Sequence, residues 1–205
     1  GIAAIAYAKL RRALDLPERP IRVYDPIQQL AIIDRDVLDR FGVDTIELGR
    51  GFALEPEAWR DWVLPDGTAC KIPSFIEPVR EDGGWAVYAP DGTKIAVQKA
   101  GSLYFEQTCF PLMDREDDDF EDLEAAMDKV MWASLGSPPA PIGFDEAGLR
   151  KLKAGAEALR ASTDRAILGL FGGNLMEWGQ FLFRIDRFLM QLAMAPQRMH
   201  RFLDR

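Results

Sequence analysis

The sequence contains few of the side chains that hold metal ions or form cross-links. It has two cysteines, Cys70 and Cys109, and a single histidine, His200, near its end. A zinc site needs three or four ligands from cysteine, histidine and carboxylates, and these residues show no recognised zinc spacing. Two cysteines in a chain of this length do not make a disulfide framework either. We expect two packed thiols, a surface histidine and no metal bound by this segment.

Basic charge and long apolar runs are also scarce. The 33 acidic residues outnumber the 25 lysines and arginines, and the formal net charge is -8. Binding nucleic acid over a broad surface needs a basic face, so we expect no nucleic-acid partner, although a local anion pocket is compatible with this charge. No apolar run is long enough to cross a bilayer, and the basic residues follow the apolar start GIAAIAYA instead of preceding it. We expect no membrane segment and a cytoplasmic protein.

Apolar residues make up 48% of the chain, enough for a substantial buried core. Their spacing predicts helices over 2–14 and 34–41. Asp34 is the expected N-cap of the second helix, and Gly42 suits the left-handed position that follows it. The chain then enters a strand almost at once, which is typical of α/β folds.

Two nearly continuous apolar stretches, 43–48 and 165–171, are the predicted buried strands. Each follows a helix and ends in glycines, a pattern that favours a parallel sheet covered on both faces. Ligands of βα folds collect at the carboxyl ends of such strands. We therefore expect the segments just after the two strands to face one pocket.

The middle of the chain has a different character. Pro-Asp-Gly-Thr occurs at 65–68 and again at 90–93 between β-rich flanks, which indicates hairpin turns. We expect an antiparallel excursion at about 59–112. The acid-rich stretch 114–124 that follows is open to two interpretations, a divalent-cation site or an exposed helix start. We favour the helix start, because EF-hand spacing and its central glycine are absent.

The order of these segments resembles the uroporphyrinogen decarboxylase superfamily, which includes the decarboxylase and the cobamide-dependent methyltransferases. The resemblance covers most of the chain, and it lies in GIAAIAYAKLRRALDL, RVYDPIQQLAIIDRDVLDRFGVDTIELGRGF, the hairpin region, FEQTCFPL and DRAILGLFGGNLMEWGQFL. It implies a TIM-type (β/α)8 barrel, which typically needs about 250 residues. The expected fold is therefore α/β, with 1–205 forming the N-terminal part of one barrel domain that carries the hairpin insertion.

The departures from the decarboxylase pattern favour the methyltransferase branch. The Arg-Gln-Ala-Gly-Arg motif of the decarboxylase is absent, and Gly49-Arg50-Gly51-Phe52 stands where that enzyme has Phe-Ser-Asp-Ile with its catalytic Asp. The resemblance then implies transfer of a methyl group from a small methylated substrate to a corrinoid (cobalamin-type) carrier protein. The zinc ligands of that branch lie in the C-terminal half, outside this segment.

Two other functions stay open beside methyl transfer. One is decarboxylation of the tetrapyrrole uroporphyrinogen without a cofactor, and the other is a non-catalytic corrinoid-binding module. The segment alone is expected to be inactive. Apolar helix faces around Leu182, Ile185 and Leu189 are expected to be uncovered in a partial barrel, which favours aggregation or a homodimer.

The candidate ligand-binding residues lie at the two strand ends. Arg50 has two interpretations. Its guanidinium either binds a carboxylate of the substrate or a side chain of the corrinoid, or it forms a salt bridge at the rim of the barrel. Glu47 is either an acid of raised pKa or the partner of Arg50 or Arg165. Asn174 and Glu177 resemble a capping box, at a helix start that also attracts anions. The full substrate-binding set is Arg50, Glu47, Gly51, Gly173, Asn174 and Glu177, with no catalytic residue assigned. Tyr24, Gln28 and Gln29 lie where the resemblance places the pocket.

Overall fold

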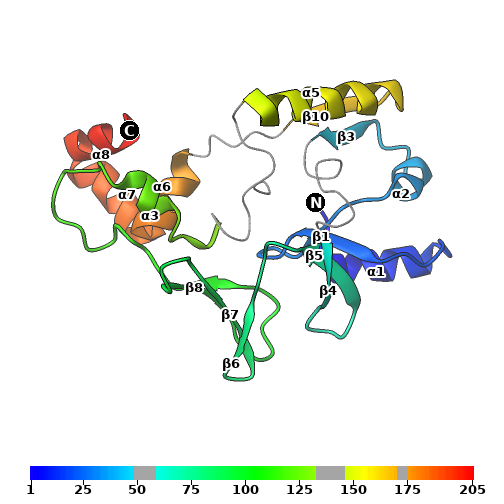
Figure 1. Cartoon of the computed structure of the whole chain (residues 1–205), viewed down its shortest axis with the longest axis horizontal. Coiled ribbons are helices and arrows are strands. Elements are labelled where there is room, and N and C mark those ends of the chain that lie inside the picture. Colours follow the sequence, from blue (N-terminus) through cyan, green and yellow to red (C-terminus); the bar gives the residue numbers. More distant parts are fainter. Residues whose placement is uncertain (49–58, 133–145, 170–174) are drawn as a thin grey trace. The chain divides into compact units, whose positions relative to one another are not determined.

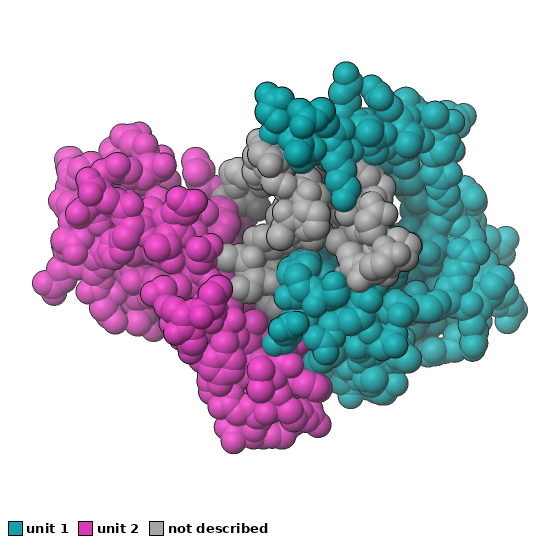
Figure 2. Space-filling view, in the orientation of Figure 1, with its two compact units in different colours: residues 1–77, 138–171 teal, residues 78–137, 172–205 magenta. Residues whose placement is uncertain are grey.

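The computed structural model describes residues 1–48, 59–132, 146–169 and 175–205. The chain forms two compact units, which Figure 2 shows in different colours. Unit 1 comprises residues 1–77 and 138–171, and unit 2 comprises 78–137 and 172–205. The secondary-structure elements of both units are labelled in Figure 1.

Unit 1 begins with an amphipathic helix packed on a mixed sheet. The buried side of α1 (Ala4–Ala13) includes Tyr7, Ala8 and Arg11. The sheet has the order β2-β1-β5-β4, with β5 parallel to β1 and the other neighbours antiparallel. Its strands are β1 (Ile21–Asp25), β2 (Leu30–Ala31), β4 (Trp59–Val63) and β5 (Ala69–Pro73).

The second sheet of unit 1 is a parallel pair of strands, each preceded by a helix. Helix α2 (Arg35–Arg40) leads into β3 (Thr45–Leu48), and α5 (Glu146–Ala161) leads into β10 (Ala166–Gly169). Strands β3 and β10 are hydrogen-bonded in parallel, and α5 lies beside them (Figure 1). The prediction that these two segments form neighbouring parallel strands is confirmed. Their expected burial on both faces is wrong, because every residue of β3 is only partly buried and three of the four residues of β10 are exposed.

The turn at the end of α2 is also confirmed, because Gly42 has a φ of 60°. The expected cap at its start is wrong in one respect. Asp34 occupies the N-cap position, but its side chain makes no capping hydrogen bond. The carboxylate instead accepts hydrogen bonds from the Tyr7 hydroxyl at 2.9 Å and from Arg11 at 3.1 Å. A buried arginine therefore competes successfully with the helix terminus for this carboxylate.

Unit 2 contains an antiparallel meander with the strand order β6-β7-β8-β9. Its strands are β6 (Val79–Glu81), β7 (Gly84–Tyr88), β8 (Lys94–Gln98) and β9 (Glu106–Gln107). Both Pro-Asp-Gly-Thr turns join antiparallel neighbours, β4 to β5 and β7 to β8, with φ of 84° at Gly67 and 85° at Gly92. The hairpins expected over 59–112 are confirmed, and they are divided between the two units.

The helices of unit 2 enclose an aromatic core. Phe120, Phe183, Phe188 and Phe202 contact one another with ring centroids 5.1–6.3 Å apart. All four rings are at most 5% exposed. The surrounding helices are α3 (Leu123–Met127), α6 (Leu175–Phe183), α7 (Ile185–Met194) and α8 (Pro196–Leu203).

The acid-rich stretch is mostly exposed and leads into α3, as predicted, but only its last residues belong to the helix start. The helix begins only at Leu123, and Phe120 within the acidic run is buried in the core. Arg198 of α8 donates to the carbonyl oxygens of Arg115 at 2.6 Å and Asp117 at 2.8 Å. The run is thus an acidic loop tied to α8 by a largely buried guanidinium.

The apolar helix faces follow the prediction in part. Ile185 and Leu189 on α7 are exposed by 53% and 47%, which confirms two of the three expected positions. The prediction that Leu182 is uncovered is wrong, because its side chain is only 1% exposed and belongs to the aromatic core. No described helix is long and apolar enough to cross a membrane.

The observed architecture is mixed α/β with three open sheets. Within the described ranges these sheets do not close into a barrel. The confirmed part of the expected fold is therefore the class, the parallel strand pair and the antiparallel hairpins.

Candidate functional site: a cavity beside β3

A cavity of about 760 Å³ lies in unit 1 beside β3. Small-molecule sites commonly have volumes of about 300–1,000 Å³ and combine apolar walls with a few polar groups. This cavity has both kinds of lining. The lining comes from the segment before β1, from β1, from the start of α2, and from β3 and β10. Its apolar residues include Ile33, Leu38 and Leu168, and its polar residues include Arg22, Tyr24 and Glu47.

Strand alternation explains how β1 contributes to the cavity. Ile21, Val23 and Asp25 are buried on one face, whereas Arg22 and Tyr24 are only partly buried on the other. Because side chains along a strand alternate between faces, this pattern directs Arg22 and Tyr24 to the same side. Both line the cavity beside β3. The I-R-V-Y-D alternation is the sequence feature that would have identified Arg22.

A buried ionic cluster anchors this wall of the cavity. The Arg11 guanidinium, 4% exposed, lies 3.1 Å from the Asp34 carboxylate and 2.9 Å from that of Asp36. It holds the pKa of the Asp36 carboxyl below its usual value. The backbone N–H of Asp34 also donates to the Tyr7 hydroxyl at 2.8 Å. Burial raises the pKa of that hydroxyl, which stays protonated at neutral pH. The cluster thus fixes α1 against the start of α2.

The structure describes only some of the predicted site residues. Arg50, Gly51, Gly173 and Asn174 lie outside the described residues, so their shared pocket stays a prediction. Glu47 lines the cavity beside β3 and stands opposite Leu168 in the strand pair.

Two arginines, Arg165 and Arg50, were proposed as partners of Glu47. Arg165 pairs with Asp39 and donates to the carbonyl oxygen of Val43 at 2.7 Å, so the alternative in which Arg165 is the partner of Glu47 is wrong. The pairing of Glu47 with Arg50 stays a prediction.

Glu177 is exposed in the first turn of α6 and belongs to unit 2. Glu47 belongs to unit 1, so the expected pocket shared by Glu47 and Glu177 stays a prediction. Of the residues that the resemblance placed near the pocket, only Tyr24 lines the cavity. Gln28 is exposed and donates to the Asp25 carboxylate at 3.1 Å, whereas Gln29 is buried.

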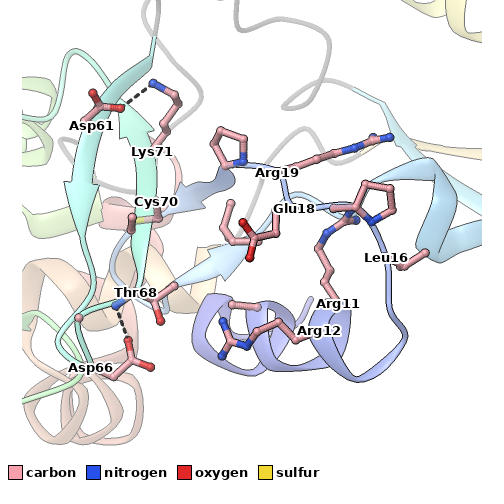
Figure 3. A pocket seen from close by; sticks show the side chains of 16 residues that line it. Arg11, Arg12, Leu16, Glu18, Arg19, Asp61, Asp66, Thr68, Cys70 and Lys71 are labelled. Carbon is pink, nitrogen blue, oxygen red and sulfur yellow. Dashed lines mark hydrogen bonds and ion pairs between the residues drawn. The ribbon is translucent and has the colours of Figure 1, made fainter.

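Unit 1 has a second cavity of about 710 Å³ between the end of α1 and the β4–β5 hairpin (Figure 3). Two of its acidic side chains have partners, because the Lys71 amine donates to Asp61 at 2.6 Å and Asp66 accepts from the Thr68 N–H at 3.0 Å. Burial raises the pKa of the Cys70 thiol in its wall to about 12. That thiol therefore stays protonated at neutral pH and is not a nucleophile.

The remaining metal-binding residue types do not converge. Cys109 is a free, half-buried thiol, and burial raises its pKa, while His200 is exposed. No group of three or more histidine, cysteine or acidic side chains among the described residues is arranged to hold a metal ion. A zinc ion therefore does not fit this part of the chain.

The cavity beside β3 is chemically suited to binding and orienting a small molecule that is partly polar and partly apolar. Its geometry supplies arginine donors, a carboxylate and an aliphatic wall in one compact unit. Comparisons of the chain with protein-family models, with curated proteins and with solved structures find no match.

Proposed function

We propose that the chain contributes to a uroporphyrinogen decarboxylase-like (β/α)8 barrel that transfers a methyl group from a small methylated substrate to a corrinoid carrier protein. The observation that supports this most is the parallel pairing of β3 and β10, each directly preceded by a helix. Parallel neighbours require a crossover connection, and repeated units of this kind build α/β barrels. The antiparallel hairpins are then an insertion in the connection between two barrel strands.

In this proposal the end of β3 forms part of the substrate site. Glu47 lies on the wall of a cavity of suitable size, and Arg50 follows three positions later. The guanidinium of Arg50 would bind an anionic group of the substrate or of the corrinoid. The flanking Gly49 and Gly51 leave room for that group near the backbone. Gly173, Asn174 and Glu177 would complete the substrate contacts from the end of the second strand.

Zinc belongs to the C-terminal half of such enzymes, and the described residues do not fit it. The role of this chain is therefore to position the substrate. It supplies a shaped cavity and charged groups that fix orientation, and accurate orientation of two reactants lowers the barrier to their reaction.

The test uses the complete open reading frame that encodes this chain. The purified protein is mixed with cob(I)alamin and either trimethylamine or a methoxybenzoate, and methylcobalamin is followed by its absorbance. We expect methylcobalamin to form. With the methoxybenzoate, whose carboxylate Arg50 would bind, Arg50→Ala should have at least about a tenfold lower kcat/KM, because a charge-assisted contact contributes about 1.5–3 kcal/mol.

Two other outcomes would each overturn methyl transfer and favour another function. Release of CO₂ from uroporphyrinogen without methylcobalamin formation would favour the decarboxylase. Binding of cobalamin with neither reaction would favour the corrinoid-binding module. Arg40→Ala is the matched control, because Arg40 is exposed at the end of α2 and does not line the cavity beside β3.

A further inference from the structure

We propose that the cavity beside β3 is a binding site for a small amphipathic anion, with Arg19 and Arg22 holding a carboxylate and the aliphatic wall holding an apolar body. This inference rests on the geometry of unit 1 and does not depend on methyl transfer. It assigns ligand-binding roles to two arginines that lie outside the strand-end segments.

Among the described residues, none accepts a hydrogen bond from the Arg22 guanidinium within the usual distance. Its side chain is 37% exposed and lines the cavity, and its nearest carboxylate oxygen, on Asp34, is 3.6 Å away. That distance allows an ion pair but is too long for a hydrogen bond. The guanidinium also lies over the Trp59 ring, 6.0 Å from its centroid, which restrains its orientation. Since arginine has five N–H donors, a restrained fork with unused donors is suited to a carboxylate.

Arg19 adds a second cation of the same kind. It lines the cavity, its side chain is 52% exposed, and its closest acidic atom is an Asp36 oxygen at 3.7 Å. The two carboxylates beside these arginines are already engaged elsewhere. Asp36 accepts two hydrogen bonds from Arg11, at 2.9 and 3.0 Å, and Asp34 is held by Arg11 and Tyr7. Arg11 balances one of these two negative charges, so the cluster of three arginines and two aspartates carries a net charge of +1.

The other charged groups of the cavity leave an excess of positive charge near Arg19 and Arg22. Arg35 is occupied by the Ser162 carbonyl and hydroxyl oxygens, at 3.2 and 2.5 Å. Glu47 is the acidic group on the β3 wall and comes from a different sheet from Arg22. An anion is therefore expected beside the β1 arginine and not beside β3.

The apolar part of the ligand has a wall of its own. Ile33, Leu38, Ile46 and Leu168 line the same cavity, and Leu168 is 52% exposed. A ligand that covers this aliphatic surface removes it from water, which adds to the charge-assisted contact. The combination selects molecules with one anionic end and an apolar body over free inorganic anions.

The test probe is 2-naphthoate, with neutral 2-naphthalenemethanol as its comparison, and binding to the full chain is measured by isothermal titration calorimetry. We expect naphthoate to bind more tightly than the alcohol. Arg22→Gln should weaken naphthoate binding about ten- to a hundredfold and leave the alcohol unchanged. Arg22→Lys should recover part of the loss, because it restores the charge without the fork.

Arg12→Gln is the matched control, since Arg12 is exposed and lines only the second cavity. Its naphthoate affinity should stay within about twofold of the unmodified chain, and circular dichroism verifies that each variant is folded. Equal binding of acid and alcohol, unchanged binding in Arg22→Gln, or no naphthoate binding by the folded chain would each overturn the proposal. Failure of methyl transfer with Arg22-dependent naphthoate binding would overturn only the proposed function.

Discussion

Arg11 shows how one buried charge organises the N-terminal part of unit 1. Its guanidinium contacts Asp34, Asp36 and the Pro17 carbonyl oxygen, which joins α1 to two later segments. A buried ion pair stabilises a fold little compared with apolar packing, but removing one partner is costly because it leaves an uncompensated buried charge. The sequence alone predicted α1 but not this cluster, because apolar spacing does not identify the partner of a buried arginine.

Replacing Arg11 should therefore be far more damaging than replacing its neighbour. We expect Arg11→Leu to lower the free energy of unfolding of the chain by about 3–5 kcal/mol in urea titrations. Arg12→Leu is the control, because Arg12 is exposed and a change there should stay within about 0.5 kcal/mol. Similar losses in both variants would show that the Arg11 cluster does not hold unit 1 together.

The same cluster predicts acid sensitivity. Contact with Arg11 lowers the pKa of Asp36 in the folded state, so its stabilising effect is present above the unfolded pKa and is lost as the pH falls through the folded value. That loss begins near pH 4, where aspartate ordinarily titrates. We expect the unfolding free energy to fall less steeply below pH 4 in Asp36→Asn than in the unmodified chain. Parallel pH profiles would contradict this assignment.

Among the secondary-structure elements, the sequence patterns that predicted the structure correctly were local ones. Apolar runs that end in glycine predicted β3 and β10, because short apolar runs bounded by turn residues are typical of strands. The two Pro-Asp-Gly-Thr turns predicted hairpins, because few residues satisfy their backbone geometry. The β1–β2 hairpin was not predicted, since its alternation is short and its second strand has only two residues. The candidate site was predicted only through Glu47 and Tyr24, because Arg22 gains its role from a cavity formed by distant segments.

Gly179 is an element-level contact that sequence spacing does not reveal. A Cβ atom at this position of α6 would lie 2.1 Å from the Phe188 ring of α7. Alanine in an ordinary helix interior stabilises by up to about 1 kcal/mol relative to glycine. Here we expect Gly179→Ala to destabilise by about 1–3 kcal/mol in chemical denaturation, because the helices must move apart.

A double-mutant cycle separates this clash from other effects of the substitution. In the Phe188→Leu background, the smaller side chain leaves space for the added methyl group, so Gly179→Ala should cost much less. A stabilising Gly179→Ala in the unmodified chain would contradict the close packing of α6 on α7.

For the whole molecule, the central feature is the parallel strand pair. It joins a segment near residue 45 to one near residue 167, and both the cavity beside β3 and the proposed barrel depend on it. The sequence predicted the direction of this pairing but not its register, because register is strongly specified only where one face of a strand is buried, and no residue of these two strands is buried.

The most direct test of the account is a cysteine cross-link across this pair, with Cys70 and Cys109 replaced by alanine. Ile46 stands opposite Ile167, and neighbouring strands bring paired Cα atoms within the range that a disulfide spans. We predict that Ile46→Cys with Ile167→Cys forms a disulfide on mild oxidation, detected by mass spectrometry of non-reduced peptides. The pair Ile46→Cys with Ala166→Cys, one position out of register, should not. Cross-linking of Thr45→Cys with Gly169→Cys, the opposition expected of antiparallel strands, would contradict the account.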